Sequence, residues 1–295
     1  MKTLTVFTPS YNRAHTLVRT YESLCRQTSD DFEWMVIDDG STDNTEEMVK
    51  EWIVDNKILI RYLKKENGGL YTGYNTAYMA ISTELNVCID SDDYMPDDAV
   101  ESIVSFWRKY GSDKYAGMLG LDYFLTNEPI GGVFPVHLKE VFFYDLYLKK
   151  LHSGDTKPVY RSELTRKVAP LVGFEGEKNF NPVYMALQID QDYPLLILNK
   201  NLCFVEYQQN DSMSASIFHQ YFNSPKSFCK LRKLEMILKR NTWRNIMRVI
   251  VHYVATSIIS GNKHFIKESP RPFLTFLLSP FGGGLYLYFK YKANK

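Results

Sequence analysis

The sequence predicts an α/β fold, with a mostly parallel sheet flanked by helices and a helical appendage at the C-terminal end. In the N-terminal part, short β-branched apolar runs alternate with amphipathic stretches, the order typical of right-handed βαβ units. Each of these runs ends in a polar loop rich in Asp, Asn or Gly. The 295-residue chain is also long enough for one large core and an appendage.

Four strands and four helices are expected before residue 111. The strands are expected at residues 4–7, 32–37, 58–63 and 85–89, and the helices at 16–26, 44–55, 74–82 and from about Pro96 onward. The helix at 16–26 places Leu17, Tyr21 and Leu24 on one face. Because the carboxyl ends of parallel strands meet at one edge of a sheet, we expect the loops after these strands to form a binding site there.

The loop after the fourth strand reads Asp90-Ser91-Asp92-Asp93 and is the most informative motif of the chain. Its three carboxylates repel one another, and a divalent cation offsets that repulsion. Carboxylate oxygens suit Mg²⁺ or Mn²⁺, which usually sit between one or two carboxylates and the phosphates of a substrate. The alternative is a surface turn in which Asp caps the helix that begins near Pro96.

The loops after the four strands together resemble the ordered signature of family 2 inverting glycosyltransferases. The motifs are Thr8-Pro9-Ser10-Tyr11-Asn12-Arg13, Val36-Ile37-Asp38-Asp39-Gly40-Ser41-Thr42-Asp43, Asn67-Gly68-Gly69 and Asp90-Ser91-Asp92-Asp93. The resemblance covers about residues 1–110. It implies a GT-A type fold, which is a Rossmann-like domain that binds a nucleotide-diphospho-sugar.

The resemblance also implies roles for single residues. Asp39 accepts a hydrogen bond from the base, Asp90 faces the ribose and sugar, and Asp92 holds Mn²⁺ or Mg²⁺ on the diphosphate. Pro9, Tyr11 and Arg13 line the nucleoside pocket. The residues implied to bind the nucleotide sugar are Thr8, Pro9, Tyr11, Arg13, Asp39, Asn67, Gly68, Gly69, Asn75, Asp90 and Ser91.

The chemistry of these residue types agrees with the resemblance. A nucleotide diphosphate is strongly negative, so a site lined by aspartates binds it through a bridging cation. An ionised Asp39 only accepts hydrogen bonds, which suits the imide N–H of a uracil-type base. Gly68 and Gly69 let the backbone approach a ligand closely. The alternatives are a capping or turn role for Asp39 and a plain turn at Gly68-Gly69.

Residues 173–178 are similar to the acceptor-side region of bacterial members that build surface polysaccharides. Inverting transfer needs a carboxylate that takes the proton of the acceptor hydroxyl. Glu177 is the candidate base, and Glu175 is the second candidate. The chain departs from the family pattern at Lys178, where many members carry Asp, and at Val183, where related sequences often show Glu. The alternative for Glu177 is a surface glutamate without a catalytic role.

The segment from Lys226 onward is basic and apolar. It contains 14 Lys and Arg but two Asp and Glu, although the whole chain has a net charge of +1. Apolar residues recur at helical spacing at Trp243, Ile246, Val249, Ile250, Tyr253, Val254 and Ile258. The later apolar runs at 272–278 and 285–289 are shorter than the roughly 20 residues that a membrane span needs.

This composition predicts an amphipathic tail that lies in the interface of an anionic inner membrane. One alternative is a helical bundle packed on the catalytic domain. Nucleic acid is not an expected partner, because no recognition motif accompanies the charge. The cysteines are Cys25, Cys88, Cys203 and Cys229, and their wide spacing favours a reducing cytosol over a zinc site or disulfides. Since residues 1–3 lead directly into the first strand, no signal peptide is expected, and we predict a cytoplasmic, peripheral location on the inner face of the cell membrane.

We therefore expect a catalytic domain at residues 1–225 and a basic helical tail at 226–295. Residues 1–110 would bind the nucleotide sugar, and residues 111–225 would form the acceptor side. The expected enzyme is a metal-dependent, inverting hexosyltransferase of bacterial surface polysaccharide synthesis. It would move one sugar from a nucleotide-diphospho-sugar, expected to be a UDP-sugar, to a glycan or lipid-linked acceptor.

A Gln-x-x-Arg-Trp sequence, the mark of processive synthases, is absent, so non-processive transfer is expected. Two alternatives stay open. The first is a non-catalytic, membrane-associated sugar-nucleotide-binding partner of an active transferase. The second is a nucleotidyltransferase, although residues 8–13 do not look like its Gly-rich pyrophosphorylase loop.

Overall fold

The computed structural model describes residues 2–206 and 217–294, and the chain divides into two compact units. Unit 1 comprises Met1–Leu171 and Met185–Glu206, and unit 2 comprises Val172–Tyr184 and Tyr207–Lys295. The sequence placed the boundary at residue 225, whereas the structure groups residues 172–184 with the C-terminal helices. The physical reason is that this segment contacts helix α9 (Pro225–Glu235), whose backbone N–H groups bind Glu177.

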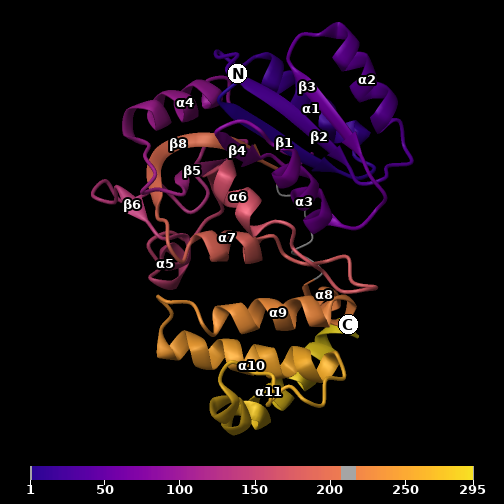
Figure 1. Cartoon of the computed structure of the whole chain (residues 1–295), viewed down its shortest axis with the longest axis vertical. Helices are drawn as coiled ribbons and strands as arrows, with labels where there is room; N and C mark the ends of the chain where they lie inside the picture. Colours follow the sequence, from indigo (N-terminus) through magenta and orange to yellow (C-terminus); the bar gives the residue numbers. More distant parts are fainter. Residues whose placement is uncertain (1, 207–216, 295) are drawn as a thin grey trace. The chain divides into compact units, whose positions relative to one another are not determined.

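Unit 1 is built on an eight-stranded mixed sheet with the strand order β3-β2-β1-β4-β7-β5-β8-β6 (Figure 1). The strands are β1 (Leu4–Ser10), β2 (Phe32–Asp38), β3 (Ile60–Lys64), β4 (Leu85–Cys88), β5 (Gly117–Phe124), β6 (Glu140–Val141), β7 (Thr156–Arg161) and β8 (Leu195–Val205). Strands β1 to β4 are parallel to their neighbours in this group, and β7 runs antiparallel between β4 and β5. The four predicted strands and their parallel arrangement are thus confirmed.

The helices of unit 1 cover the sheet. They are α1 (Ala14–Cys25), α2 (Thr45–Asp55), α3 (Leu70–Ala80), α4 (Ala99–Tyr110), α5 (Phe143–Leu148), α6 (Ser162–Val168) and most of α7 (Val183–Ile189). Residues of α1, α2 and α4 share one core cluster with Trp34 of β2. Within it the rings of Tyr21 and Trp52 stack at 4.2 Å. Val6 of β1 belongs to this cluster, and the following residue, Phe7, points to the opposite face of the sheet. There its ring packs edge-on against Tyr74 of α3 at 5.2 Å.

The strand register brings the predicted loops to one edge of the sheet. Ser10, the last residue of β1, lies opposite Asp38, the last residue of β2, and Asp38 lies opposite Lys64 at the end of β3. Strand β4 ends at Cys88, opposite Phe7. The loops that follow all four strands therefore leave the sheet from its carboxyl edge, as the sequence predicted.

Unit 2 is a helical bundle made of α8 (Ile217–Asn223), α9 (Pro225–Glu235), α10 (Trp243–Ile259) and α11 (Pro272–Ala293), together with residues 172–184. The apolar residues between 243 and 258, which we expected to face a membrane, mostly lie in the core of the bundle. Val249, Ile250, Tyr253 and Val254 of α10 are buried within the bundle. For α10, the structure supports the packing role that the sequence left open.

The last helix also differs from the expectation. The two apolar runs at 272–278 and 285–289 join through Pro280 and three glycines into the single helix α11, which is 22 residues long. By length and hydropathy, α11 is the one helix among the described residues that could cross a membrane, and 17% of its most apolar window is buried. The sequence analysis treated the two runs as separate, and the Pro and Gly residues between them are unfavourable inside helices. Packing of Gly282 against Val254 of α10 helps to explain why the helix continues, since a Cβ on Gly282 would lie 2.4 Å from the Val254 side chain.

Candidate active site

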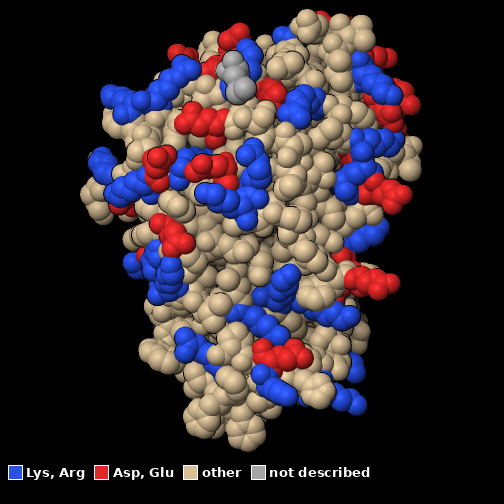
Figure 2. Space-filling model, viewed as in Figure 1, with Lys and Arg blue, Asp and Glu red and all other residues tan. Residues whose placement is uncertain are grey.

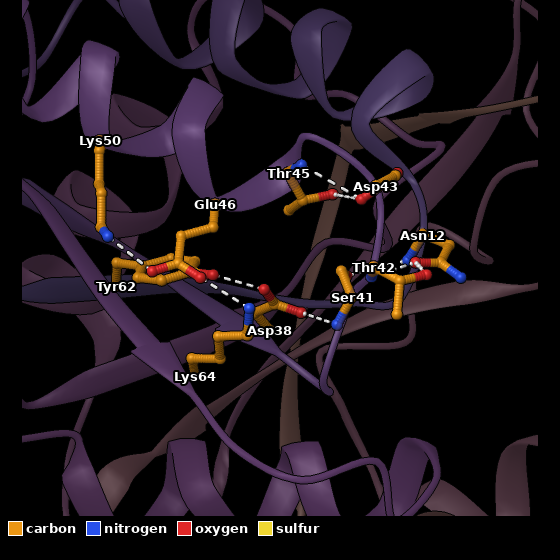
Figure 3. A network of polar contacts seen from close by, with 10 residues as sticks. All are labelled: Asn12, Asp38, Ser41, Thr42, Asp43, Thr45, Glu46, Lys50, Tyr62 and Lys64. Atoms are coloured by element: carbon orange, nitrogen blue, oxygen red, sulfur yellow. Dashed lines mark hydrogen bonds and ion pairs between the residues drawn. The ribbon is translucent and has the colours of Figure 1, made fainter.

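The loops after β1 and β2 hold each other in place through side-chain to backbone hydrogen bonds (Figure 3). Asn12 has a φ of 53°, a left-handed conformation that Asn tolerates well. Its backbone N–H donates to Ser41 Oγ at 2.9 Å, and its Oδ1 accepts from the backbone N–H of Thr42 at 2.8 Å. Asp43 accepts from the backbone N–H of Ala14 at 3.1 Å. The two loops therefore form one fixed surface at the sheet edge.

Asp38 is a scaffold residue of this surface. It is fully buried. One carboxylate oxygen accepts from the Ser41 backbone N–H at 2.7 Å, and the other accepts from the Tyr62 hydroxyl. Burial and the Asp38 charge raise the pKa of Tyr62, so the hydroxyl stays protonated as a donor. Nearby, hydrogen bonds from Lys50 and Lys64 lower the pKa of Glu46 to about 2 (Figure 3).

Asp39, the predicted partner of the base, shapes the loop between β3 and α3. Its oxygens accept from the backbone N–H groups of Gly68 at 3.0 Å and Gly69 at 2.8 Å, and it forms an ion pair with Lys65. Gly69 has a φ of 91°, which explains why glycine stands there. In this structure Asp39 therefore orders the loop before α3, rather than its own turn. An ionised carboxylate has about four acceptor positions, so a further bond to a base stays a prediction.

Several other predicted nucleotide-sugar residues have internal partners. Thr8 is buried, and its Oγ1 accepts from the Trp34 indole N–H at 3.0 Å, so its side chain belongs to the core. The Asn75 amide exchanges two hydrogen bonds with the backbone of Leu171, at 2.9 Å and 2.7 Å. These contacts give Thr8 and Asn75 structural roles that motif matching did not reveal.

The remaining predicted residues of the site differ in their exposure. The Tyr11 side chain is 48% exposed and is therefore available for stacking. Arg13, Asn67 and Gly68 are half-buried, and Pro9 and Ser91 are buried. A Cβ on Gly68 would lie 2.9 Å from the Thr72 side chain. Pro9 packs beneath α3, where a Cβ on Gly73 would lie 3.2 Å from it.

The Asp90-Ser91-Asp92-Asp93 motif contains carboxylates with different surroundings. Among the described residues, the Asp92 carboxylate has no hydrogen-bond or ion-pair partner. The Arg19 guanidinium donates to the backbone oxygen of Asp92 instead. Asp90 is exposed and has a weak contact from the Cys88 thiol at 3.8 Å. Loss of hydration among the surrounding protein atoms raises the pKa of Asp90, the Asp92 charge adds to this, and Lys157 opposes it.

Asp93, in contrast, points into a buried cluster. Its carboxylate lies 3.8 Å from the Lys157 ammonium and accepts from the Cys203 thiol at 3.6 Å. Lys157 also lies 3.6 Å from Asp122. Burial raises the pKa of Asp93 to about 7 and that of Asp122 to about 6, although Lys157 opposes both shifts. Burial would lower the pKa of Lys157, but the surrounding carboxylates outweigh it and raise that pKa, so we take the lysine to be charged.

Two supports of this loop were missed by sequence reasoning. Lys157 lies on β7, where a single lysine in an apolar strand carries no recognisable motif. Helix α1 holds the loop from the other side, since Thr20 Oγ1 donates to the Asp93 backbone oxygen at 2.7 Å and Ser23 Oγ accepts from Met95 N–H at 3.2 Å. Helical periodicity cannot identify hydrogen-bond partners that lie about 70 residues away in the sequence.

The predicted base, Glu177, lies in unit 2 and is buried. One of its oxygens accepts from the backbone N–H of Lys226 at 2.9 Å. The other accepts from Ser227 N–H at 2.8 Å and from Ser227 Oγ at 2.7 Å. These donors lie in the first turn of α9, whose unpaired N–H groups and positive dipole end favour a carboxylate. The contacts fit a capping role, whereas Glu175 is exposed.

The residues at the carboxyl edge of the sheet fit a substrate-bridged cation better than a preformed metal cage. Among the described residues, no group of three or more His, Cys, Asp or Glu side chains is arranged to hold a metal ion. Asp92 and Asp90 nevertheless supply oxygen donors that other side chains leave largely unused. A cation with few protein ligands is typical of Mg²⁺ sites in which substrate phosphates complete the coordination.

Comparison with known proteins identifies the N-terminal part of the chain. Residues 5–122 match the family described as Glycosyl transferase family 2. "Glycosyltransferase GlyA" of Streptococcus pneumoniae serotype 4 is 33% identical over 143 residues, which are 48% of this chain and 20% of that protein. The match thus spans a fifth of the length of this relative.

Solved structures show the same fold at low sequence identity. S. aureus TarS 1-349, in complex with UDP-GlcNAc, is similar with a TM-score of 0.63 and 18% identity, over 91% of this chain and 76% of that one. Mannosyltransferase PcManGT from Pyrobaculum calidifontis, in complex with GDP-Man and Mn²⁺, is similar with a TM-score of 0.56 and 15% identity, over 99% and 83%. Residues 5–122 therefore match glycosyltransferase family 2, and the chain has a GT-A-like fold, as its four loop motifs suggested.

Proposed function

We propose that this protein is a metal-dependent inverting glycosyltransferase that moves one sugar from a nucleotide-diphospho-sugar to a glycan or lipid-linked acceptor. The observation that carries the proposal is that the carboxylates at the sheet edge differ in whether they have partners within the protein. Asp38, Asp39, Asp43 and Asp93 have partners within the fold, whereas Asp92 and Asp90 are left for a ligand.

We propose a UDP-sugar as the donor. In support, the similar TarS structure holds UDP-GlcNAc. The loops joined by Asn12, Ser41 and Thr42 would carry the nucleoside, with Tyr11 available to stack on the base. Asp92, with Asp90 beside it in the loop, would hold Mn²⁺ or Mg²⁺. When bound, such a cation stabilises the charge of the departing diphosphate.

The base for the acceptor is proposed to lie in residues 173–178. A general base needs a carboxylate oxygen that is free to take a proton. The three hydrogen bonds of Glu177 support a structural role for it, so we favour the second candidate, Glu175, whose side chain is exposed. In this proposal Glu175 takes the proton of the acceptor hydroxyl while the new glycosidic bond forms and the nucleoside diphosphate leaves.

One observation also favours a second function. Lys178 and Val183 replace acidic residues of the family pattern, and Glu177 is used within unit 2. A chain without a working base would be a non-catalytic, membrane-associated sugar-nucleotide-binding partner of an active transferase. It would bind the donor with a divalent cation but would not transfer the sugar.

A donor-hydrolysis screen separates these functions. The full chain is incubated with a panel of nucleotide sugars and Mn²⁺ or Mg²⁺, and release of nucleoside diphosphate is measured. We expect one donor to respond, and the response to disappear in Asp92→Ala but not in Asp97→Ala, an exposed carboxylate that pairs with Arg26 on the surface. Donor binding without release by any donor, with or without saccharide acceptors, would favour the non-catalytic partner. No binding at all would contradict both functions.

We further propose that the protein works in the cytoplasm, peripherally on the inner face of the cell membrane, where lipid-linked acceptors are found. The basic composition of the C-terminal segment supports this location, because anionic lipids attract clustered Lys and Arg. Fractionation of cells that produce the full chain tests it: the protein should sediment with membranes and be released by high salt or alkaline carbonate. Recovery entirely in the soluble fraction at low salt would contradict it.

A further inference from the structure

Helix α11 carries an uninterrupted apolar stripe on its exposed side. The exposed positions of the helix up to Tyr288 are Phe273, Phe276, Leu277, Pro280, Phe281, Gly284, Leu287 and Tyr288, with the small Pro272 at the start. Their spacing of three and four residues keeps them on one face along about 25 Å of helix. The Phe273, Phe276 and Phe281 side chains are 73%, 62% and 66% exposed. Contiguous exposed apolar surfaces of this kind mark interaction sites.

The opposite side of α11 is fixed within unit 2. Thr275, Gly282 and Phe289 are its buried positions. Gly282 sits against Val254 of α10, and the Phe289 ring stacks on Tyr221 of α8 at 4.5 Å. Ser269 and Thr275 share a hydrogen bond of 2.6 Å at the start of the helix. The rotation of α11 about its axis is therefore set by packing, and packing directs the apolar stripe to solvent.

The charges around the stripe identify its partner. Lys263, Lys267 and Arg271 precede α11, and Lys290 and Lys292 end it. From residue 263 to residue 294 the sequence contains one acidic residue, Glu268, which pairs with Lys233 at 3.0 Å. In Figure 2 the lowest part of the view, where α11 lies, is mostly uncharged. An apolar, aromatic face with Lys and Arg at both ends matches an anionic lipid surface.

A second copy of the chain fits this surface less well. Two α11 stripes related by a two-fold axis would place the basic ends of one helix near the basic ends of the other, and like charges would oppose the contact. A membrane span fits less well too. The 22-residue length suits one, but insertion would separate Phe289 from Tyr221 and Gly282 from Val254.

We propose that the exposed stripe of α11 is a membrane-docking surface, on which the helix lies flat in the headgroup region of an anionic bilayer while its other side stays packed on α8 and α10. This inference deepens the peripheral location proposed above by naming the surface, and it does not require transferase activity. The Phe and Leu side chains would enter the acyl boundary, and Tyr288, Tyr291 and the terminal lysines would stay at headgroup level.

Vesicle co-sedimentation of the full chain tests the proposal. The probes are vesicles of phosphatidylglycerol with phosphatidylcholine and vesicles of phosphatidylcholine alone. We expect strong binding to the anionic vesicles, weak binding to the neutral ones and partial release at high salt. Phe276→Ser with Phe281→Ser should lower the partition onto anionic vesicles by about tenfold or more, because affinity scales with buried apolar area. Lys290→Ala with Lys292→Ala should lower it at low salt and much less at high salt.

A matched control replaces equally exposed apolar residues of unit 1. Val54 and Val136 are 83% and 84% exposed, and Val54→Ser with Val136→Ser should leave vesicle binding within about twofold of the wild type. Circular dichroism checks that the variants stay folded. Bound wild-type protein should be released by alkaline carbonate, as an interfacial protein is.

The proposal is overturned by equal binding to both kinds of vesicle, or by undiminished binding of the folded Phe variant. Retention after carbonate treatment would indicate a span instead. A wild-type dimer that the Phe substitutions dissociate, without vesicle binding, would indicate a second copy as the partner. Hydrolysis of a soluble donor is measured in parallel. If no donor is hydrolysed but the vesicle results hold, the proposed function fails and the docking surface stands.

Discussion

Replacing Glu177 by Gln distinguishes a scaffold residue from a catalytic base. The carboxylate receives three hydrogen bonds from the first turn of α9 and is 8% exposed. Gln keeps the size of the side chain but offers one oxygen and one NH₂ group. If its oxygen faces Ser227, its NH₂ group faces the Lys226 N–H, and two donors then oppose each other.

The magnitude follows from these contacts. A buried N–H left without an acceptor costs about 1–3 kcal/mol. Loss of the negative charge at the helix N-terminus adds about 0.3–2 kcal/mol. Together we expect a loss of about 2–4 kcal/mol in the free energy of unfolding of unit 2. With a urea dependence of about 2 kcal/mol per molar, the unfolding midpoint should fall by roughly 1–2 M.

The assay is urea unfolding followed by far-UV circular dichroism, together with turnover of a soluble donor at low urea. Glu175→Gln is the matched control for stability alone, because this side chain is exposed and an exposed substitution should change stability by less than about 0.5 kcal/mol. As the proposed base, Glu175 should lose turnover when it is replaced by Gln. An unchanged midpoint for Glu177→Gln, combined with a loss of turnover of about 10²–10⁴-fold, would refute the reasoning and make Glu177 the base.

Lys157→Met should destabilise unit 1 by about 3–5 kcal/mol in thermal unfolding, because it leaves the buried carboxylates of Asp93 and Asp122 without a cation. A melting temperature equal to that of the wild type would refute this. Burial raises the pKa of Asp122 to about 6 in the folded protein, above its unfolded value, so its contribution to stability is present below about pH 4 and is lost, by about 3 kcal/mol, as the pH rises toward 6. In Asp122→Asn, the urea midpoint should therefore vary less between pH 4 and pH 6, and a pH dependence equal to that of the wild type would contradict this. Truncation after Ser224 should give an aggregating protein, because it removes Lys230, whose ammonium lies over the rings of Phe174 and Phe180, and so uncovers them. A truncated protein that light scattering shows to be monodisperse would contradict this.

Local patterns of the sequence were sufficient to predict the strands and helices in the first half of unit 1. Strands β1 to β4 and helices α1 to α4 follow from apolar periodicity and from turn residues, which act over a few positions. The convergence of their loops follows from the geometry of a parallel sheet. This is why Asp90 and Asp92 could be placed at a common edge before any contact was known.

The partners of single residues could not be predicted in the same way. Lys157 meets Asp93 across 64 residues of sequence, and Glu177 meets Ser227 across 50. No local signal reveals such pairs, so the motifs alone did not show the internal hydrogen bonds of Asp39, Asn75 and Glu177. Helix α11 shows the same limit: the sequence gives two separate apolar runs around Pro280 and the glycines, whereas packing on α10 favours one continuous helix.

The most direct test of the account is the effect of Asp92 on binding of a nucleoside diphosphate. Isothermal titration of UDP into the full chain, with and without Mn²⁺, should show binding that depends on the cation. In Asp92→Ala this dependence should be lost while the melting temperature holds or rises slightly, because one of several repelling carboxylates is removed. Asp97→Ala serves as the exposed control. Cation-dependent affinity for UDP that is unchanged in Asp92→Ala would contradict the assignment of the site.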